Sequence, residues 1–124
     1  MYYYKGISIP VETPESLPVI DIMELEKGKL VFIEIEFPDG CVGLVHCTVD
    51  YNAVQLVPWN KVGDLYGNNR TFLIPLNYML NTPPYEIEIK AWNEDDTYPH
   101  TISVGAMVEG KLTSEPVAQV LPVS

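Results

Sequence analysis

The sequence predicts an all-β fold: a single-domain antiparallel β-sandwich with a jelly roll as the favoured topology, eight or nine short strands and almost no helix. Two segments alternate apolar and polar residues with the period of two that is typical of a strand, KLVFIEIEF at 29–37 and YEIEIKAW at 85–92. Turn-forming residues separate nearly all of the apolar runs. No window of about a dozen residues free of Pro and Gly carries an apolar stripe with the helical period.

The turn residues mark the boundaries between the predicted strands. A first strand lies within residues 2–9, and Gly28 in EKGK separates the second strand from the one at 29–37. FPDGC at 37–41 offers Pro, Asp and Gly in the order that a type I turn prefers, and DYNA at 50–53 indicates a tight hairpin. We expect strands at residues 2–9, 18–26, 29–37, 42–50, 53–57, 71–75, 85–92, 100–109 and 117–121.

Two longer connections interrupt this series of hairpins, PWNKVGDLYGNNR at 58–70 and LNYMLNTPP at 76–84. A jelly roll needs such crossovers between its sheets, whereas a simple meander needs neither. Within the second connection, PLNYMLN at 75–81 is expected to form at most one short turn of helix.

Length and composition favour one globular domain. The chain has 124 residues, of which 47% are hydrophobic, and this is enough for one continuous core. Its 8 Tyr and 11 Pro favour strands and turns over helices. We therefore expect a single β-sandwich domain over residues 1–124, with 1–10 and 114–124 as candidate assembly arms.

The chain is strongly acidic, with 7 basic residues against 17 acidic ones and a net charge of −10. Nucleic acid is therefore an unfavourable partner, because affinity for a polyanion depends on Lys and Arg. Phosphate-rich membranes are repelled in the same way. No apolar run is long enough for a transmembrane helix, and MYYYKGISIP lacks the basic start and apolar core of a secretory signal, so we expect synthesis in a cytoplasm.

Cys41 and Cys47 are the only cysteines. If the intervening VGLVH is a strand, the two residues lie roughly 20 Å apart, too far for a disulfide. We expect free thiols in a reducing compartment, with Cys47 in the core. The chain lacks the further cysteines or nearby histidines that a zinc cluster requires.

An acidic loop is the segment closest to a functional motif. In AWNEDDTYPHTISV at 91–104, Glu94, Asp95 and Asp96 lie between two predicted strands. Carboxylates are the ligands that calcium prefers, so this loop is the candidate metal site, although the spacing of a dedicated calcium loop is absent. The alternative is a solvated or interface loop, begun by the turn former Asn93 and closed by Pro99.

His46 and His100 are the only histidines, and a joint catalytic or metal role requires the strands at 42–50 and 100–109 to be neighbours. Sequence does not decide this. A jelly-roll metalloenzyme needs several histidines and a carboxylate at its metal site, and two histidines on separate strands are too few for this. We expect His100 to form a hydrogen bond within its turn, and His46 to lie on the strand face opposite Val45, Cys47 and Val49.

Motifs for catalysis are lacking, so the chain is expected to be no enzyme and to need no cofactor. There is no Gly-x-Ser-x-Gly sequence, no glycine-rich phosphate loop and no signature of an activated cysteine. Glu34 and Glu36 lie two positions apart in one predicted strand, and Glu86 and Glu88 do so in another. Within each pair, both side chains therefore project from the same face of the sheet. Such pairs mark a solvent face more often than an acid–base dyad.

Exposed aromatic and apolar residues are the candidate contacts with a partner. A run of three tyrosines in a strand places at least one on each face of the sheet, which leaves ring area for a protein neighbour or a sugar. The interface candidates are Tyr2, Tyr3, Tyr4, Trp59, Tyr98, Val117, Val120 and Leu121.

The segments IEIEFPDGCVGLVHCTV and PPYEIEIKAWNEDDTYPHTISV, within residues 30–109, resemble small β-sandwich proteins encoded by phages and other viruses. The resemblance implies a single jelly roll with a structural role in the virion, as a capsid, vertex, decoration or tail subunit. Its partners would be copies of itself or other virion proteins, and no catalytic residues are implied.

The sequence thus predicts a non-enzymatic assembly protein of a virion that works by self-association and docking. The alternative is a carbohydrate-binding or host-attachment module, in which Trp59 and loop tyrosines stack on sugars beside a calcium ion near Asp95 and Asp96. A cupin-like metalloenzyme is the third hypothesis.

Overall fold

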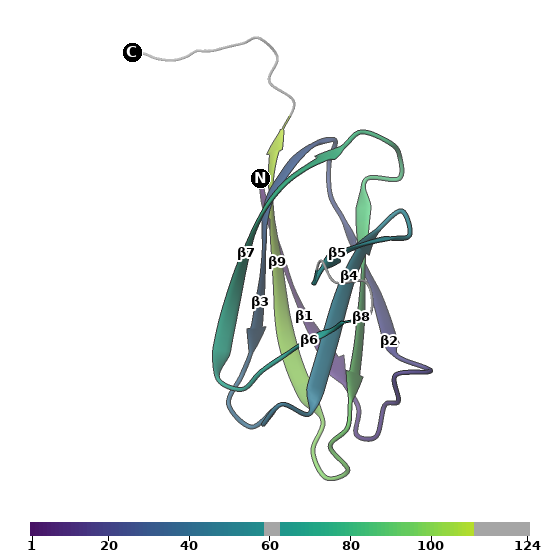
Figure 1. The fold of residues 1–124 in the computed structure, drawn as a ribbon, viewed down its shortest axis with the longest axis vertical. Helices are drawn as coiled ribbons and strands as arrows, with labels where there is room; N and C mark the ends of the chain where they lie inside the picture. Colours follow the sequence, from purple (N-terminus) through teal and green to yellow (C-terminus); the bar gives the residue numbers. More distant parts are fainter. Residues whose placement is uncertain (59–62, 111–124) are drawn as a thin grey trace.

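The computed structural model describes residues 1–58 and 63–110, which form two antiparallel sheets packed face to face (Figure 1). Its strands are β1 (Tyr2–Ile9), β2 (Val19–Glu24), β3 (Gly28–Phe37), β4 (Val45–Tyr51), β5 (Val54–Val57), β6 (Leu65–Tyr66), β7 (Arg70–Leu80), β8 (Glu86–Asn93) and β9 (His100–Gly110). The predicted all-β sandwich is confirmed.

The strands alternate between the sheets along the chain, except that β4, β5 and β6 follow one another in the same sheet. One sheet has four strands in the order β1-β9-β3-β7, and the other has the order β2-β8-β4-β5, with the short β6 also paired to β4. The pairs β1–β9, β2–β8, β3–β7 and β4–β5 are all antiparallel and are nested in the sequence. Segments far apart in the chain are therefore neighbours, and the first and last described strands lie side by side.

The core lies between the sheets and follows the predicted period of two. In β3, Ile33, Ile35 and Phe37 are fully buried, and Ile87 and Ile89 of β8 face them from the other sheet. A bulge between Leu30 and Phe32 interrupts the alternation at the start of β3. The other core residues are Ile7, Ile9, Met23, Leu30, Cys41, Val45, Cys47, Val49, Tyr51, Leu56, Val57, Leu80, Ala91, Ile102, Val104, Ala106 and Val108.

Strand β7 is longer than the sequence predicted. Residues 70–80 are one strand, so the expected long connection at 76–84 is wrong. The short turn of helix that was considered for 75–81 does not form. The strand continues because Leu76, Tyr78 and Leu80 keep the alternation and pack inward. Proline is tolerated inside it because β7 is an edge strand, where a missing N–H group costs least.

The segment before β4 was also predicted incorrectly. The strand begins at Val45 rather than at residue 42, because Val42 and Gly43 have positive φ values of 52° and 75° and form a turn. The Leu44 N–H group donates to the Cys41 carbonyl oxygen across this turn. Cys41 and Cys47 are free, and Cys47 is buried, as expected. Cys41 is buried as well, which was not predicted, and only the last part of the segment between them belongs to a strand.

Two other turns lie where they were predicted. Asn52 and Ala53 have φ values of 47° and 67°, which is the backbone of the tight hairpin predicted between β4 and β5. The Cys41 N–H group donates to the Pro38 carbonyl oxygen and closes a turn at the position predicted after β3. The predicted type I geometry is wrong, because Gly40 has a φ of 108°, the positive value that a type II turn requires at its third residue.

The β1 and β2 edges of the sandwich are joined by side chains. Lys5 Nζ lies 2.7 Å from Asp21 Oδ1 and donates to the Ile22 carbonyl oxygen, and Tyr3 Oη donates to Glu26 Oε1. The predicted strand at 117–121 and the arm at 114–124 lie outside the described residues, as do residues 59–62 of the predicted 58–70 connection. Residues 1–58 and 63–110 contain no helix capable of crossing a membrane.

Candidate functional site

The acidic loop between β8 and β9 is held by its own side chains. Asn93 is buried, donates to the Tyr98 carbonyl oxygen and accepts from the Asp95 N–H group, which confirms it as the turn initiator. Asp95 Oδ1 accepts from the N–H groups of Thr97 and Tyr98. Asp95 Oδ2 lies 2.9 Å from His100 Nε2, so the predicted hydrogen bond of His100 within its turn is confirmed.

These contacts determine the charge state of Asp95. The hydrogen bonds from His100 and from the Thr97 N–H group lower the pKa of the Asp95 carboxyl group most, and the Tyr98 N–H group adds to this, while desolvation opposes them. The carboxylate thus closes the loop instead of pointing freely into solvent.

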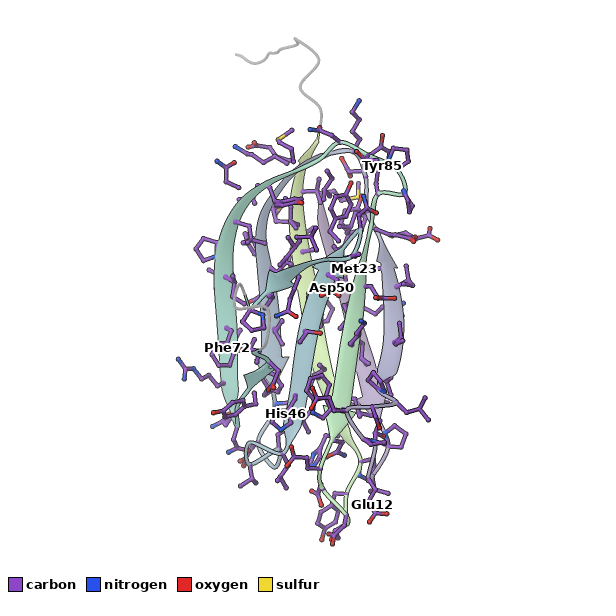
Figure 2. All side chains as sticks on the ribbon, turned by 45° about the vertical axis from the view of Figure 1, so that its right-hand side comes forward. Glu12, Met23, His46, Asp50, Phe72 and Tyr85 are labelled. Atoms are coloured by element: carbon purple, nitrogen blue, oxygen red, sulfur yellow. The ribbon has the colours of Figure 1, made fainter. Side chains whose placement is uncertain are left out.

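His46 lies on the outer face of β4, as predicted, toward the same end of the sandwich as this loop (Figure 2). Its Nδ1 atom lies 2.6 Å from Asp64 Oδ1. Glu94 Oε2 lies 2.9 Å from Nε2 without the alignment of a hydrogen bond, so this buried nitrogen has no hydrogen-bond partner within the described residues. The imidazole ring stacks on Trp92, with centroids 5.5 Å apart and planes 7° apart.

The structure thus brings both histidines to consecutive carboxylates of one loop, Glu94 and Asp95, although His46 and His100 belong to different sheets. Sequence reasoning missed this link. The oxygens that were predicted to bind calcium contact protein groups, including Asp96 Oδ1, which accepts from Thr97 Oγ1. Over residues 1–58 and 63–110, no three His, Cys, Asp or Glu side chains are grouped so as to hold a metal ion.

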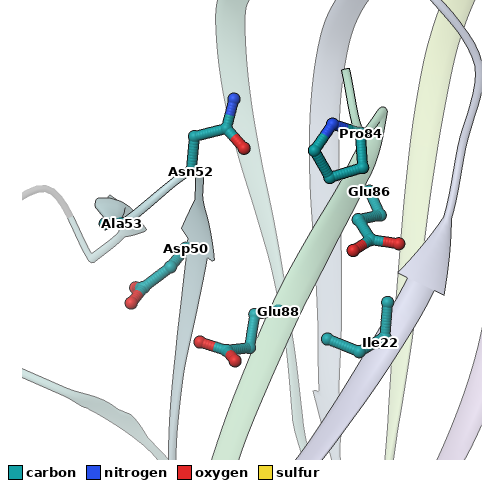
Figure 3. Close-up of a pocket in the computed structure, with 7 residues that line it drawn as sticks. All are labelled: Ile22, Asp50, Asn52, Ala53, Pro84, Glu86 and Glu88. Atoms are coloured by element: carbon teal, nitrogen blue, oxygen red, sulfur yellow. The ribbon is translucent and has the colours of Figure 1, made fainter. Parts of the chain in front are cut away.

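The outer face of the five-stranded sheet carries a second acidic cluster. Asp50, Glu86 and Glu88 line a pocket of about 170 Å³ (Figure 3). Lys90 Nζ is 3.7 Å from Asp50 and 3.8 Å from Glu88, and Asp50 Oδ1 is buried with no hydrogen-bond partner in the described part of the chain. Like charges that face each other across neighbouring strands oppose folding by repulsion.

The outer face of the four-stranded sheet carries an aromatic platform, which we define as Tyr2, Tyr4 and Phe32. The Tyr2 ring lies 6.2 Å from the Tyr4 ring, with 29° between their planes, and 6.1 Å from the Phe32 ring. Tyr2 Oη donates to Glu34 Oε1 at 2.8 Å. Gly105 lies beneath the hydroxyl end of Tyr2, because a Cβ atom there would be 2.0 Å from Tyr2 Oη.

Burial raises the pKa of Tyr2 to about 12, and the hydrogen bond to Glu34 adds to the rise. The hydroxyl group therefore stays protonated and donating. The side chain of Tyr3 points to the other side of β1, toward the core, so the prediction that the three tyrosines divide between two faces is confirmed.

Strand β7 presents apolar residues on both faces. On the outer face, Leu73 and Met79 are 62% and 49% exposed. On the inner face, the side chains are only partly buried: Phe72, Ile74, Leu76 and Tyr78. Among the described strands, β7 pairs with β3 alone, so its other edge is unpaired.

The predicted interface residues are scattered over the molecule. Tyr2 and Tyr4 lie on the outer face of one sheet, whereas Tyr98 is 64% exposed in the loop at the end of the sandwich. Trp59, Val117, Val120 and Leu121 lie outside the described residues. The apolar exposure of β7 was not predicted, although the uncharged run TFLIPLNYML at 71–80 signals it.

Comparison of the chain with models of protein families, with curated proteins and with solved structures finds no significant match. The resemblance to virion proteins therefore stays a hypothesis.

Proposed function

We propose that the protein is a non-enzymatic structural subunit of a virion that assembles by self-association through the free edge of β7. The observation that carries the proposal is an edge strand of eleven residues with apolar side chains on both faces. Edge strands that stay monomeric are commonly short, charged, covered or interrupted by proline, and of these features β7 has only Pro75 and, at its first residue, Arg70. A strand that is apolar on both sides is suited to a partner that continues the sheet.

Charge favours a second copy of the chain as that partner. The chain carries a net charge of −10, yet β7 contains no carboxylate and only one charged residue, Arg70. By contrast, β2 carries Asp21 and Glu24. Two acidic molecules repel each other least where both present an acid-free edge. This holds for β1, β5 and β7, and β7 is the longest of the three.

The topology supports a jelly roll, and with it the virion role that the sequence resemblance implies. A jelly roll combines eight strands in two Greek keys, and nested pairing of the first strand with the last is its pattern. The pairs β1–β9, β2–β8, β3–β7 and β4–β5 follow this pattern when β6 is counted as part of a connection. We include in this proposal that the subunit belongs to the capsid, a vertex, the decoration or the tail of the virion.

Sedimentation velocity over a series of protein concentrations tests the proposal. We expect the wild type to form dimers or larger species, and Leu73→Glu to shift the distribution to monomer, because a carboxylate is introduced into the acid-free edge. Leu73 is 62% exposed but is paired with Glu34 on β3, so a thermal melt of the variant checks that the fold persists.

Leu17→Glu is the matched control, because Leu17 is 76% exposed in the loop before β2 and its substitution adds the same charge. We expect this variant to associate like the wild type. A wild type that is monomeric at every concentration, or equal behaviour of the two variants, would contradict the proposal.

A further inference from the structure

We propose that the aromatic platform of Tyr2, Tyr4 and Phe32 binds a neutral saccharide chain. This inference goes beyond the assembly function and concerns another edge of the molecule. The platform extends from β1 to Phe32 on β3, whereas the proposed assembly contact is the unpaired edge of β7, the strand beyond β3.

The ring geometry suits a sugar. Tyr4 is 61% exposed and Tyr2 40% exposed, although both rings lie in an aromatic cluster. Aromatic faces carry partial negative charge and attract the C–H groups of a ligand, and Tyr adds a hydroxyl group at its edge.

The platform is already in place before a ligand binds. Tyr2 crosses the bare backbone of Gly105 on β9 and donates to Glu34 on β3, so its ring is fixed over three strands. A ring fixed in this way loses little conformational freedom on binding. Glu34 is itself a hydrogen-bond acceptor at the platform, suited to a sugar hydroxyl group.

The surface beside the platform is flat and polar. The next row of paired residues across the sheet is Gly6, Ser103, Glu36 and Thr71, and Ser8 and Thr101 follow. The Ser8 and Thr101 hydroxyl groups lie 3.0 Å apart, and Gly6 adds no side chain to the surface. Small hydroxyl residues and a carboxylate on a flat sheet match the hydroxyl groups of an extended saccharide.

The negative charge of this face determines which extended ligands it can bind. Glu34 and Glu36 lie on the platform side of an acidic chain, so anionic glycans and nucleic acid are repelled. A second copy that packed on this face would bring the same carboxylates together. A purely apolar partner would leave the polar row without hydrogen bonds, which costs free energy. A neutral saccharide avoids all three penalties.

Binding to neutral polysaccharides tests the inference. Full-length protein is mixed with insoluble cellulose, chitin and starch, and with an array of neutral oligosaccharides, and the bound fraction is measured. We expect the wild type to bind at least one of these probes, and Tyr4→Ala to weaken that binding roughly tenfold through loss of one stacking ring. Tyr98→Ala is the matched control, because Tyr98 is 64% exposed and lies in the β8–β9 loop.

Two results would overturn the inference: a wild type that binds none of the probes, or equal binding by Tyr4→Ala and Tyr98→Ala. Sedimentation of the same samples separates this inference from the assembly function. Met79→Glu, on the outer face of β7 opposite Lys29 rather than Glu34, is expected to lose self-association and keep saccharide binding. If Tyr4→Ala instead changes only the oligomeric state, the platform is a protein interface and the saccharide inference is wrong.

Discussion

Gly105 determines where the Tyr2 ring lies on the four-stranded sheet. Any side chain at this position would meet the Tyr2 hydroxyl group, whereas a Cβ atom at Gly6, on the same face, meets only Thr101 Cγ2 at 3.7 Å. The two glycines therefore differ in function although both lie in strands. One makes room for a ring, and the other keeps the surface flat.

We expect Gly105→Ala to displace Tyr2 from Glu34 and to lower its pKa from about 12 toward the ordinary tyrosine value of about 10. Tyr3 stays at about 12, because its hydrogen bond to Glu26 is unaffected. In a spectrophotometric titration, one fewer tyrosine should ionise near pH 12 in this variant than in the wild type. Gly6→Ala is the control, and a titration of Gly105→Ala equal to wild type would contradict the role of Gly105.

The same pKa shifts have a consequence for stability. A phenol whose pKa is higher in the folded state than in the unfolded state stabilises the fold fully below the unfolded value, and this contribution is lost as the pH rises through the folded value. For Tyr2 and Tyr3 the loss runs from about pH 10 to about pH 12. In urea unfolding, the free energy of unfolding of Gly105→Ala should fall less than that of the wild type over this pH range.

At the scale of elements, the loop between β8 and β9 depends on one carboxylate. Because the pKa of Asp95 is lowered in the folded state, its contribution to stability is present above the unfolded value of about 4 and is lost as the pH falls through the folded value. We expect the Thr97 and Tyr98 amides, which donate to Asp95 Oδ1, to lose protection from hydrogen exchange only as the pH falls through the lowered folded-state pKa of Asp95, below its ordinary value of about 4.

Asp95→Asn should abolish this acid dependence in an NMR measurement of amide protection. Asp96→Asn should retain it, because Asp96 accepts only from the Thr97 hydroxyl group and closes no backbone turn. Equal acid dependence in both variants would show that Asp95 does not hold the loop.

Elements were predictable where alternation and turn chemistry agreed. The alternation within 29–37 and 85–92 predicted β3 and β8, and DYNA predicted the hairpin before β5. In β7 the two signals conflicted, because Pro75 indicated a break while the residues around it kept the strand period. The edge position decided in favour of the strand, and an edge is a property of the whole sheet.

At the scale of the whole molecule, the two-layer fold was predictable and the candidate sites were not. Strand count, turns and apolar content follow from local sequence. The platform depends on cross-strand register, which places Tyr2, Gly105 and Glu34 together from three separate strands. Likewise, the link from His46 to Glu94 depends on the pairing of β4 with β8. A period of two gives the face of a residue but not its neighbours.

Net charge leads to a prediction about assembly. Each copy carries a charge of −10, so self-association through the acid-free β7 works against repulsion between the remaining surfaces. Raising the salt concentration from roughly 20 mM to roughly 500 mM shortens the screening length from about 20 Å to about 4 Å. We therefore expect salt to tighten the association several-fold in sedimentation equilibrium.

Salt also promotes nonspecific association of apolar surfaces, and Leu73→Glu distinguishes the two effects. If association uses β7, this variant stays largely monomeric at both salt concentrations, because its new carboxylate lies at the contact itself. If the variant associates with salt as strongly as the wild type, the contact is elsewhere. Association that weakens with salt would point to attraction between opposite charges, which an acid-free edge with one arginine does not supply.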